Sequence, residues 1–324
     1  MPITNINSYV PTMNEFIAHW TQVDAALPTD LTLIGPDQTV MTREGFIALR
    51  DTLQTQFQVL VGYLNDREIA RGGIRIDKAR MLAQFNEFNA MLDGYWGGTP
   101  FANARANAPS VGDGEERFLA PMRDAFSLWG KLNVAPPPPG LVLPLQLSDG
   151  TEIADFGAEI TSLQAAHALE AVANQNAVLT RSERDTTMET ARAAMISYRK
   201  IVPARCAQLP TLVETLPAVT PPPGHTPDPV AASAVFVPPD QAQITHAAST
   251  EPTLLRYELR GNPGDSYDEE DAVLIASHTP DQPREFLTAF GLTHPGTRVT
   301  FKIFTILETG NEAGSAAMTV ERPE

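Results

Sequence analysis

The segment GNPGDSYDEEDA, residues 261–272, holds five acidic side chains and no basic one. Carboxylates at this density can coordinate a calcium ion, or they can be solvated on a loop. The acidic positions are Asp265, Asp268, Glu269, Glu270 and Asp271. Their spacing lacks the alternating ligands, the central glycine and the final glutamate of an EF-hand loop. The sequence therefore favours a solvated loop, with a weak calcium site as the alternative.

Motifs of known catalytic sites are absent from the sequence. There is no G-x-S-x-G, G-x-x-x-x-G-K-[ST] or G-x-G-x-x-G turn. The six histidines are His19, His167, His225, His246, His278 and His294. None forms H-x-x-x-H or H-E-x-x-H, and the E-x-x-H motif of di-iron bundles fails at His19 and His167. We therefore expect no catalytic, cofactor-binding or metal-binding residues; an enzyme with an unfamiliar site is the alternative.

A few isolated side chains could still bind or react. Glu159 and His167 are two helical turns apart and can share a face, where a satisfied polar pair is expected. Cys206, the single cysteine, follows Arg205, and a positive neighbour lowers the pKa of a thiol. A half-buried structural thiol is the expected alternative. Trp96, in DGYWGG, is a candidate weak ligand site for sugar stacking, although such aromatics usually close a core.

The charge of the chain excludes several classes of partner. The formal net charge is −16, with −8 on each side of Val230. Such an even acidic balance leaves no basic patch for nucleic acid or an anionic membrane. The single cysteine excludes an internal disulfide, and the first residues lack the regions of a secretory signal. No run reaches the roughly 18 apolar residues of a membrane span, so we expect a cytoplasmic protein.

Apolar residues at helical spacing predict long helices in the first two thirds of the chain. Residues 14–27 form the first, and a β excursion with a turn at Gly35-Pro36-Asp37 follows. Thr42 can cap a second helix. Its apolar positions are Phe46, Leu49, Leu53, Phe57, Leu60 and Leu64. The segment ARGGIRID, residues 70–77, is expected to end this helix in a loop, and a further helix covers residues 82–95.

The same order of elements recurs about 110 residues later. The corresponding residues are Trp20 and Trp129, Leu31 and Leu141, Leu33 and Leu143, Phe46 and Phe156, Leu53 and Leu163, and Arg71 and Arg181. The second copy has a turn at Ser148-Asp149-Gly150, a helix over residues 154–173 and a last helix over residues 188–202. Tryptophans at equivalent places are expected to anchor cores. Two such copies can form one antiparallel helical bundle with short β excursions.

A proline-rich linker, residues 217–229, separates this bundle from a region of different period. Beyond it, alternation predicts strands. They are AASAVFV, AQITHA, LLRYELR, AVLIAS, REFLTAF, RVTFKIFTIL and AAMTVER. The predicted fold is multidomain, α plus all-β: helical repeats at 1–112 and 113–216, and a β-sandwich at 230–324.

The end of the chain resembles a fibronectin type III domain. That family has a leucine, a turn, a long F strand, an N-x-x-G-x-S turn and a final strand. The matching residues are Leu292, Gly296, Asn311, Gly314 and Ser315, and YELRG at 257–261 is similar to its C strand. The family's B-strand tryptophan is missing, and Val299 stands at its corner tyrosine. The resemblance implies a sandwich scaffold, and the arrangement resembles uncharacterised bacterial proteins with a helical N-terminal region.

Alternation along RVTFKIFTIL assigns the two faces of the expected F strand. Val299, Phe301, Ile303 and Thr305 share the face expected to meet the core. Phe304 and Ile306 lie on the opposite face, where large apolar side chains need a cover. We therefore predict a contact surface at Phe304 and Ile306, within the chain or between chains.

These observations favour a non-enzymatic structural or interaction protein that acts through protein–protein contacts and assembles with itself. The alternative is a binding module that recognises a glycan or protein ligand through the sandwich or an exposed aromatic. The mass in solution separates the two, because a homo-oligomer favours the first and a monomer the second.

Overall fold

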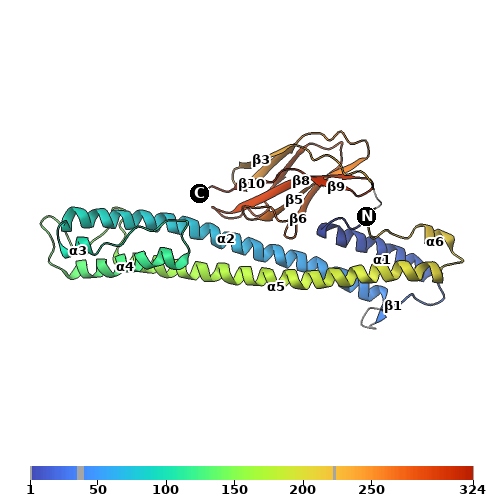
Figure 1. The fold of residues 1–324 in the computed structure, drawn as a ribbon, viewed down its shortest axis with the longest axis horizontal. Coiled ribbons are helices and arrows are strands. Elements are labelled where there is room, and N and C mark those ends of the chain that lie inside the picture. The colour runs from blue at the N-terminus through green and yellow to red at the C-terminus, as the bar shows by residue number, and fades with distance from the viewer. Residues whose placement is uncertain (1, 35–39, 222–223, 324) are drawn as a thin grey trace. The chain divides into compact units, whose positions relative to one another are not determined.

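The computed structural model describes residues 2–34, 40–221 and 224–323. Figure 1 shows helices followed by antiparallel β-sheets, as the sequence predicts. The helices are η1 (Ile6–Ser8), α1 (Tyr9–Ala26), α2 (Arg43–Trp96), α3 (Pro100–Asn103), α4 (Glu115–Val134), α5 (Ile153–Arg205) and α6 (Pro210–Glu214). The strands are β1 (Leu33–Ile34), β2 (Val40–Met41), β3 (Ala232–Val237), β4 (Gln241–His246), β5 (Leu254–Pro263), β6 (Val273–His278), β7 (Glu285–Thr288), β8 (Arg298–Leu307), β9 (Glu312–Gly314) and β10 (Met318–Glu321). No helix within the described ranges is long and apolar enough to cross a membrane.

The chain divides into two compact units, and the division falls within the long helices α2 and α5. Unit 1 comprises Met1–Asn65, Ala173–Thr293 and Thr297–Arg322. Unit 2 comprises Asp66–Val172, His294–Gly296 and Pro323–Glu324. Unit 1 therefore contains most of the β-sheet region and one group of helical segments, and unit 2 contains a second group.

Each unit has a helical core built on the same plan. In unit 1, α1 packs against the beginning of α2 and the end of α5. In unit 2, α4 packs against the beginning of α5 and the end of α2. The ring centroids of Trp20 and Phe46 are 6.0 Å apart, and those of Trp129 and Phe156 are 5.8 Å apart. The repeat seen in the sequence therefore extends to the packing of each core.

An offset of 110 residues relates the two long helices along most of their length. Phe88, near the end of α2, packs against Trp129 with the ring centroids 5.2 Å apart. Tyr198, near the end of α5, packs against Trp20 with the ring centroids 5.0 Å apart. Further buried pairs at this offset are Leu53 and Leu163, Met81 and Ala191, Phe85 and Met195, Leu92 and Val202, and Trp96 and Cys206. Each copy thus supplies the end of its long helix to the core that contains the other copy's short helix.

The loops after the two short helices correspond in a register that differs from the predicted one. Asp24 Oδ1 accepts the backbone N–H of Leu31 at 2.9 Å, and Asn133 Oδ1 accepts that of Leu145 at 2.9 Å. Leu31 therefore corresponds to Leu145, and the predicted pairing with Leu141 is wrong. The prolines at 136–139 lengthen the second loop before it reaches the core.

The two β excursions also differ from each other. β1 pairs with β2 in the first copy, and the predicted turn at residues 35–37 lies outside the described residues. In the second copy, residues 135–152 are all described and contain no strand. A turn closes this loop instead, because the N–H of Gly150 donates to the carbonyl of Leu147.

The prediction of two separate helices after the β excursion of each copy, which would form a helical hairpin, is wrong, because α2 and α5 are each continuous. α2 runs through residues 70–77, and α5 joins the two helices predicted at 154–173 and 188–202. A helical glycine costs about 1 kcal/mol relative to alanine. Beside the two glycines of ARGGIRID, however, Ile74 is buried and Arg75 pairs with Glu68 at 3.3 Å. Tertiary packing therefore overrides the local glycine signal.

Replacing Gly73 with alanine is expected to raise the free energy of unfolding by about 0.5–1 kcal/mol. A Cβ at Gly73 would meet no heavy atom within 4 Å, so the entropic gain is unopposed. Urea denaturation followed by far-ultraviolet circular dichroism measures the change. Gly157→Ala is the control, because its Cβ would lie 2.7 Å from the Phe126 ring. Destabilisation by Gly73→Ala would show that residues 70–77 are not helical in solution.

The predicted strands of the C-terminal region are present, and a further one joins them. One sheet has the order β10-β8-β5-β6, with β9 paired to β8, and the other has the order β3-β4-β7. This further strand, β9, has three residues, which is too short a segment for an alternating pattern to be recognised in the sequence. Residues 217–221 and 224–229 of the proline-rich segment lie outside helices and strands.

The core of this region forms between the two sheets, and the face assignment of β8 is confirmed. Val299, Phe301 and Ile303 are fully buried in it. Thr305, on the same face, is also fully buried. The region is therefore sandwich-like, with β5 and β8 at the centre of the larger sheet.

Candidate functional site

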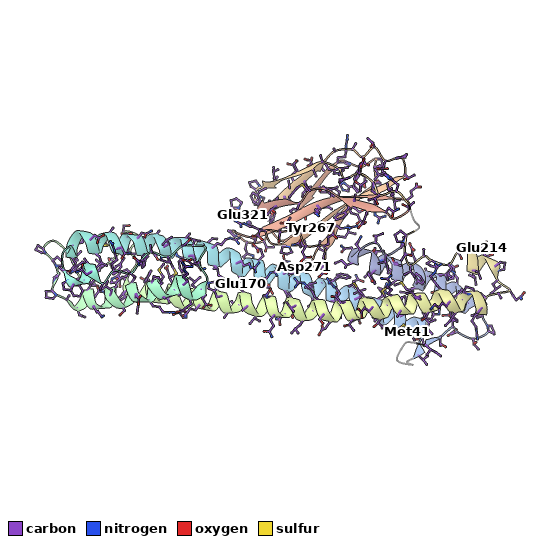
Figure 2. All side chains as sticks on the ribbon, in the orientation of Figure 1. Met41, Glu170, Glu214, Tyr267, Asp271 and Glu321 are labelled. Carbon is purple, nitrogen blue, oxygen red and sulfur yellow. The ribbon has the colours of Figure 1, made fainter. Side chains whose placement is uncertain are left out.

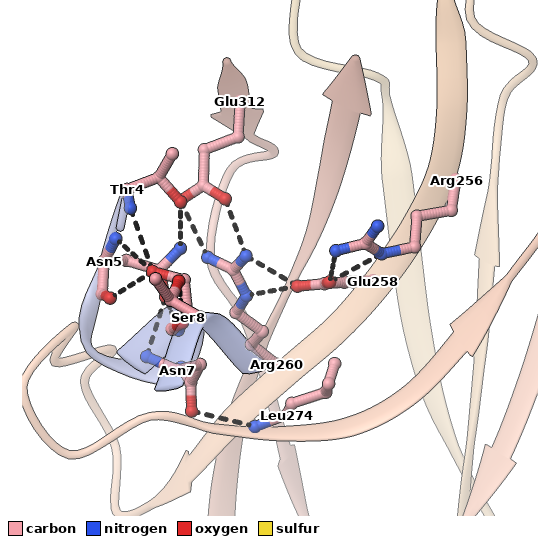
Figure 3. A network of polar contacts seen from close by, with 10 residues as sticks. Thr4, Asn5, Asn7, Ser8, Arg256, Glu258, Arg260, Leu274 and Glu312 are labelled. Atoms are coloured by element: carbon pink, nitrogen blue, oxygen red, sulfur yellow. Dashed lines mark hydrogen bonds and ion pairs between the residues drawn. The ribbon is translucent and has the colours of Figure 1, made fainter. Parts of the chain in front are cut away.

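The larger sheet carries charged side chains on its outer face. On β5 these are Arg256, Glu258 and Arg260, and their partners across on β8 are Ile306, Phe304 and Lys302. Figure 3 shows the two arginines on either side of Glu258, with Glu312 of β9 and Asn5 of the N-terminal segment beside Arg260. All of these residues belong to unit 1.

Arg260 is the centre of this network. Its guanidinium donates to Glu258 Oε2 at 2.6 and 2.9 Å, and to the two oxygens of Glu312 at 2.7 and 2.9 Å. Glu258 also accepts a hydrogen bond from Arg256 Nε at 2.8 Å. The side chains of Glu258 and Arg260 are 3% and 4% exposed. Both charges are therefore withdrawn from water and depend on each other for stabilisation.

The network holds Arg260 in its charged form. Burial lowers the pKa of Arg260, but the hydrogen bonds and charges of Glu312 and Glu258 outweigh burial and raise the pKa above its ordinary value. A charged guanidinium donates hydrogen bonds and cannot accept a proton. The arrangement can therefore bind and hold a group, but Arg260 cannot act as a base.

The N-terminal segment is fixed on the sheet through Asn5. Asn5 Nδ2 donates to Glu312 Oε1 at 2.7 Å. Its Oδ1 accepts the N–H groups of Asn7 at 2.8 Å and Ser8 at 3.2 Å, and Ser8 Oγ accepts the N–H of Asn5 at 3.1 Å. This reciprocal capping box orders η1. One side chain thus joins the start of the chain to the charged network.

Asn7 attaches the same segment to the edge of the sheet. Its Nδ2 donates to the Ala272 carbonyl at 2.9 Å, and its Oδ1 accepts the Leu274 N–H at 3.3 Å. β6 is the last strand of its sheet, so its outer backbone groups lack a neighbouring strand. The Asn7 amide supplies one donor and one acceptor in place of that strand.

A cavity of about 610 Å³ lies beside the network in unit 1. Its charged lining residues are Glu15, Arg256, Glu258, Arg260 and Glu308. No histidine or cysteine is found among the described residues that line it. The Ser8 hydroxyl, also in the lining, donates to the Asn5 carbonyl at 2.6 Å. The cavity can therefore hold a polar group beside the charged network.

The acidic segment connects β5 to β6, and one of its five carboxylates is not solvated. Asp265, Asp268, Glu269 and Glu270 are exposed, as predicted. Asp271, labelled in Figure 2, is 4% exposed and accepts hydrogen bonds from Arg181 of α5 at 2.6 and 2.5 Å. For Asp271 the solvated-loop prediction is wrong, because a bidentate arginine replaces water around the carboxylate.

A second arginine of α5 contacts the same segment one turn later. Arg184 is 1% exposed and donates to the Glu270 carbonyl, and its guanidinium lies 5.8 Å from the Phe57 ring centroid. The hydrogen bond from Arg181 to Asp271 raises the pKa of Arg181. Both guanidinium groups are joined to the loop, so the acidic segment is an attachment point of the sheet within unit 1.

Trp96 and Cys206, two candidate reactive or binding residues, are buried. Trp96 is 4% exposed within the core of unit 2, so the expectation of an exposed ring for sugar stacking is wrong. Cys206 is 1% exposed, and burial raises the pKa of its thiol although Arg205 opposes the shift. The two residues occupy equivalent positions in the two copies, at an offset of 110 residues. This equivalence indicates that both side chains serve to pack a core.

The structure does not bring Glu159 and His167 together. Glu159 pairs with Arg80 at 3.2 Å, and His167 Nδ1 lies 3.8 Å from a Glu170 oxygen. These are ordinary polar contacts of partly exposed helical residues. They form no cluster that could bind a metal ion.

Phe304 and Ile306 are covered by the chain itself. Phe304 is 4% exposed and Ile306 is 2% exposed. The Arg260 guanidinium lies 4.0 Å from the Phe304 ring centroid, and a Cβ at Gly314 would meet this ring at 2.9 Å. The two side chains therefore form no exposed patch in a single chain, and a role for them between chains stays a prediction.

His19 has a structural place in the core of unit 1. Its Nε2 lies 2.8 Å from the Leu212 carbonyl, and its Nδ1 lies 2.8 Å from the Tyr198 hydroxyl. A carbonyl only accepts, so Nε2 carries the proton and Nδ1 accepts from Tyr198. Burial raises the pKa of Tyr198 well above its ordinary value. The pair joins α1, α5 and α6 through these two hydrogen bonds.

Part of the polar site has a signal in the sequence. The R-x-E-x-R spacing of residues 256–260 places three charges on one face of a strand, and unlike charges on a single face can pair. By contrast, Asn5, Asn7 and Arg184 bind partners far along the chain. No local pattern distinguishes them from other polar surface residues.

The chain is similar to known proteins only in part of its structure. No protein-family model and no curated protein sequence matches the chain. An Fn3-like protein from Clostridium thermocellum aligns with 31% of this chain and 97% of its own, at 17% identity and a TM-score of 0.25. A myokine structure aligns with 31% of this chain and 100% of its own, at 13% identity and a TM-score of 0.25.

Pectate lyase PelI from Erwinia chrysanthemi, solved with tetragalacturonic acid, is also similar over part of its length. The alignment covers 28% of this chain at 17% identity, with a TM-score of 0.24. The chain spans only 28% of that enzyme. The structural neighbours thus include an Fn3-like protein, and none of these likenesses bears on activity.

Proposed function

We propose that the chain is a non-enzymatic structural or interaction protein that acts through protein–protein contacts and assembles with copies of itself. The observation that carries this proposal is the pairing of its buried charges. Arg260 is bound by Glu258 and Glu312, and Arg181 is bound by Asp271. Groups that would hold a substrate in an enzyme are used here to fix parts of unit 1 to one another. A rigid module that presents constant surfaces suits assembly.

The strand order supports a fibronectin type III-like assignment for the sandwich. The matched segment at 257–261 lies in β5, and Asn311 and Gly314 lie at β9, beside the long strand β8. That family is used mostly for binding and spacing. Because a fold hosts many functions, the assignment adds weight to an interaction role and says nothing of chemistry.

The expected partner is protein, and first of all a second copy of the chain. A net charge of −16 without a basic patch supports neither nucleic acid nor an anionic membrane as a partner. A cytoplasmic location remains part of the proposal. It fits a chain with a single, buried cysteine.

A binding module is the second candidate, and the 610 Å³ cavity favours it. Its volume lies in the range of small-molecule sites, about 300–1,000 Å³. The ligand would be a glycan or a protein segment that reaches the outer face of the sheet. Trp96 no longer contributes to this candidate, because it is buried.

The mass of the purified protein in solution is expected to be at least twice the 35.1 kDa of one chain. Light scattering coupled to size exclusion measures it. A closed oligomer gives a discrete mass, and an open one gives a mass that grows with concentration. A mass of one chain at every concentration contradicts self-assembly and favours the binding module.

A further inference from the structure

Four rings, two of them histidines, join the two sheets of the sandwich at one edge. His246 of β4 contacts Tyr257 of β5, with the ring centroids 4.3 Å apart, and Phe286 of β7, with the centroids 5.8 Å apart. His278 of β6 stacks on Phe286 at 4.0 Å, with the ring planes 18° apart. β5 and β6 belong to the larger sheet, and β4 and β7 belong to the smaller one. We call these four residues, all in unit 1, the edge stack.

The strand that supplies Phe286 to the edge stack is short and lies at the end of its sheet. β7 has four residues and pairs with β4 as the last strand of the smaller sheet. Of its four side chains Phe286 alone is buried, at 2% exposed. A strand with few buried contacts and hydrogen bonds opens at a lower free energy than the core of a sheet. What happens around Phe286 therefore decides whether β7 stays in place.

His246 fits the edge stack as a neutral ring. Its Nδ1 lies 2.9 Å from the Ala247 carbonyl, and because a carbonyl only accepts, Nδ1 carries the proton. Its Nε2 is buried without a hydrogen-bond partner among the described residues, and the whole residue is 8% exposed. The rings of Tyr257 and Phe286 attract an imidazolium, but they provide no acceptor for a proton on Nε2. A second proton would therefore place a buried donor and a charge where the described residues compensate neither.

The basic groups around His246 oppose its protonation. Arg284 lies beside His246 in the sheet, because the backbone N–H of His246 donates to the Arg284 carbonyl at 3.1 Å. Burial lowers the pKa of His246 below its ordinary value, and Arg284 and His278 lower it further, although the hydrogen bond to Ala247 acts in the opposite direction. The buried ring therefore resists a charge for a geometric reason and an electrostatic one.

The carboxylates of the neighbouring strands lie on the outer faces of the two sheets. Glu258 of β5 pairs with arginines on the outer face of the larger sheet. Glu285 of β7 is exposed and alternates with the buried Phe286, so it points outward from the smaller sheet. β3 and β6 contain no ionisable side chain apart from His278. A charged His246 therefore has no counter-ion on the strands packed against it.

We propose that β7 is released from the sandwich in mildly acidic solution, and that the uptake of a proton by His246 drives the release. A base whose pKa is lower in the closed state than in the open state binds protons on opening. The closed state is therefore fully stable above the ordinary histidine value of about 6.5 and loses stability as the pH falls below it.

Release of β7 changes the surface of the sandwich. It gives His246 Nε2 access to water, and it uncovers the Phe286 ring and the backbone groups of β4 that β7 pairs with. Unpaired backbone groups along a strand form an edge that other chains can join. The sandwich thus gains in acid an edge that is covered at neutral pH, and this inference stands independently of the proposed function.

Hydrogen exchange of the full chain tests the proposal. The amides are followed from about pH 7.5 to about pH 5, on either side of the ordinary histidine value, and corrected for the pH dependence of the intrinsic exchange rate. The protection factors of the β7 amides are expected to fall severalfold as the pH is lowered, whereas those of β5 and β8 stay constant. His246→Phe keeps a ring in the edge stack and cannot be protonated, so it should abolish the pH dependence. His225→Phe is the matched control, because His225 is 66% exposed, and it should behave like the wild type.

A second variant covers the case in which phenylalanine does not fold. His246→Asn can donate to the Ala247 carbonyl and carries no charge at any pH, so it should also abolish the pH dependence. A fall as large in the folded His246 variant as in the wild type overturns His246 as the sensor. A fall shared by the β5 and β8 amides overturns a local release, because the whole sandwich then unfolds. Protection of β7 that does not change with pH in the wild type overturns the proposal altogether.

Discussion

Replacing Arg260 with methionine is expected to lower the free energy of unfolding of the sandwich by about 3–5 kcal/mol. The substitution removes the partner of Glu258 while leaving that carboxylate buried, at 3% exposed. It also removes the bonds to Glu312 and the guanidinium over the Phe304 ring. Urea denaturation gives the global change, and hydrogen exchange of the β5 and β8 amides shows whether the loss is local to the sheet.

Two further variants separate burial from charge. Arg298→Met removes an ion pair with Glu321 whose partners are 31% and 47% exposed, so a loss of at most about 1 kcal/mol is expected. The double variant Glu258→Leu with Arg260→Met replaces the buried pair by apolar side chains, and it should be more stable than Arg260→Met alone. A double variant no more stable than the single one would show that stranding the Glu258 charge is not the main cost.

Strand β8 illustrates what the sequence predicts well. Apolar residues at every second position from Val299 to Ile303 predict its core face, and these three side chains meet the opposite sheet. The residues that alternate in the sequence are the ones that are buried, so this face can be assigned without knowledge of a distant partner. The same reasoning predicts the remaining strands except β9.

Continuity of the long helices illustrates what the sequence does not predict. The glycines in residues 70–77 favour a loop by local propensity, and the helix persists because its neighbours are buried and paired. The pair of Arg181 and Asp271 is equally hidden, since 90 residues separate the two. Local patterns predict the elements of this chain, whereas its charged contacts depend on which elements meet.

The surroundings of Phe304 are predicted in part by the sequence. Its outward direction follows from alternation, and the need for a cover follows from its size. The identity of the cover does not follow, because Arg260 and Tyr267 reach the ring from other strands and loops. Sequence reasoning therefore identified a residue that needs a contact without identifying the contact.

Replacing Trp129 with alanine is expected to lower the free energy of unfolding by about 3–5 kcal/mol. The ring is 1% exposed and lies between Phe88 and Phe156, at centroid distances of 5.2 and 5.8 Å. Its Nε1 donates to the Leu145 carbonyl at 3.3 Å, so the substitution leaves both a cavity and a buried acceptor without this donor. Thermal unfolding measures the change, and hydrogen exchange of α4 locates it.

The internal repeat supplies the matched comparison for this prediction. Trp20 occupies the equivalent place at 1% exposed, and Trp20→Ala should cost about as much as Trp129→Ala because each ring anchors its own core. Phenylalanine separates packing from hydrogen bonding: Nε1 of Trp20 has no partner among the described residues, so Trp20→Phe should cost less than Trp129→Phe. Val134→Ala, at an 86% exposed position of α4, should change stability by no more than about 0.5 kcal/mol. If Trp129→Ala were as mild as Val134→Ala, the tryptophans would not anchor the two cores, and the repeat would be one of sequence order alone.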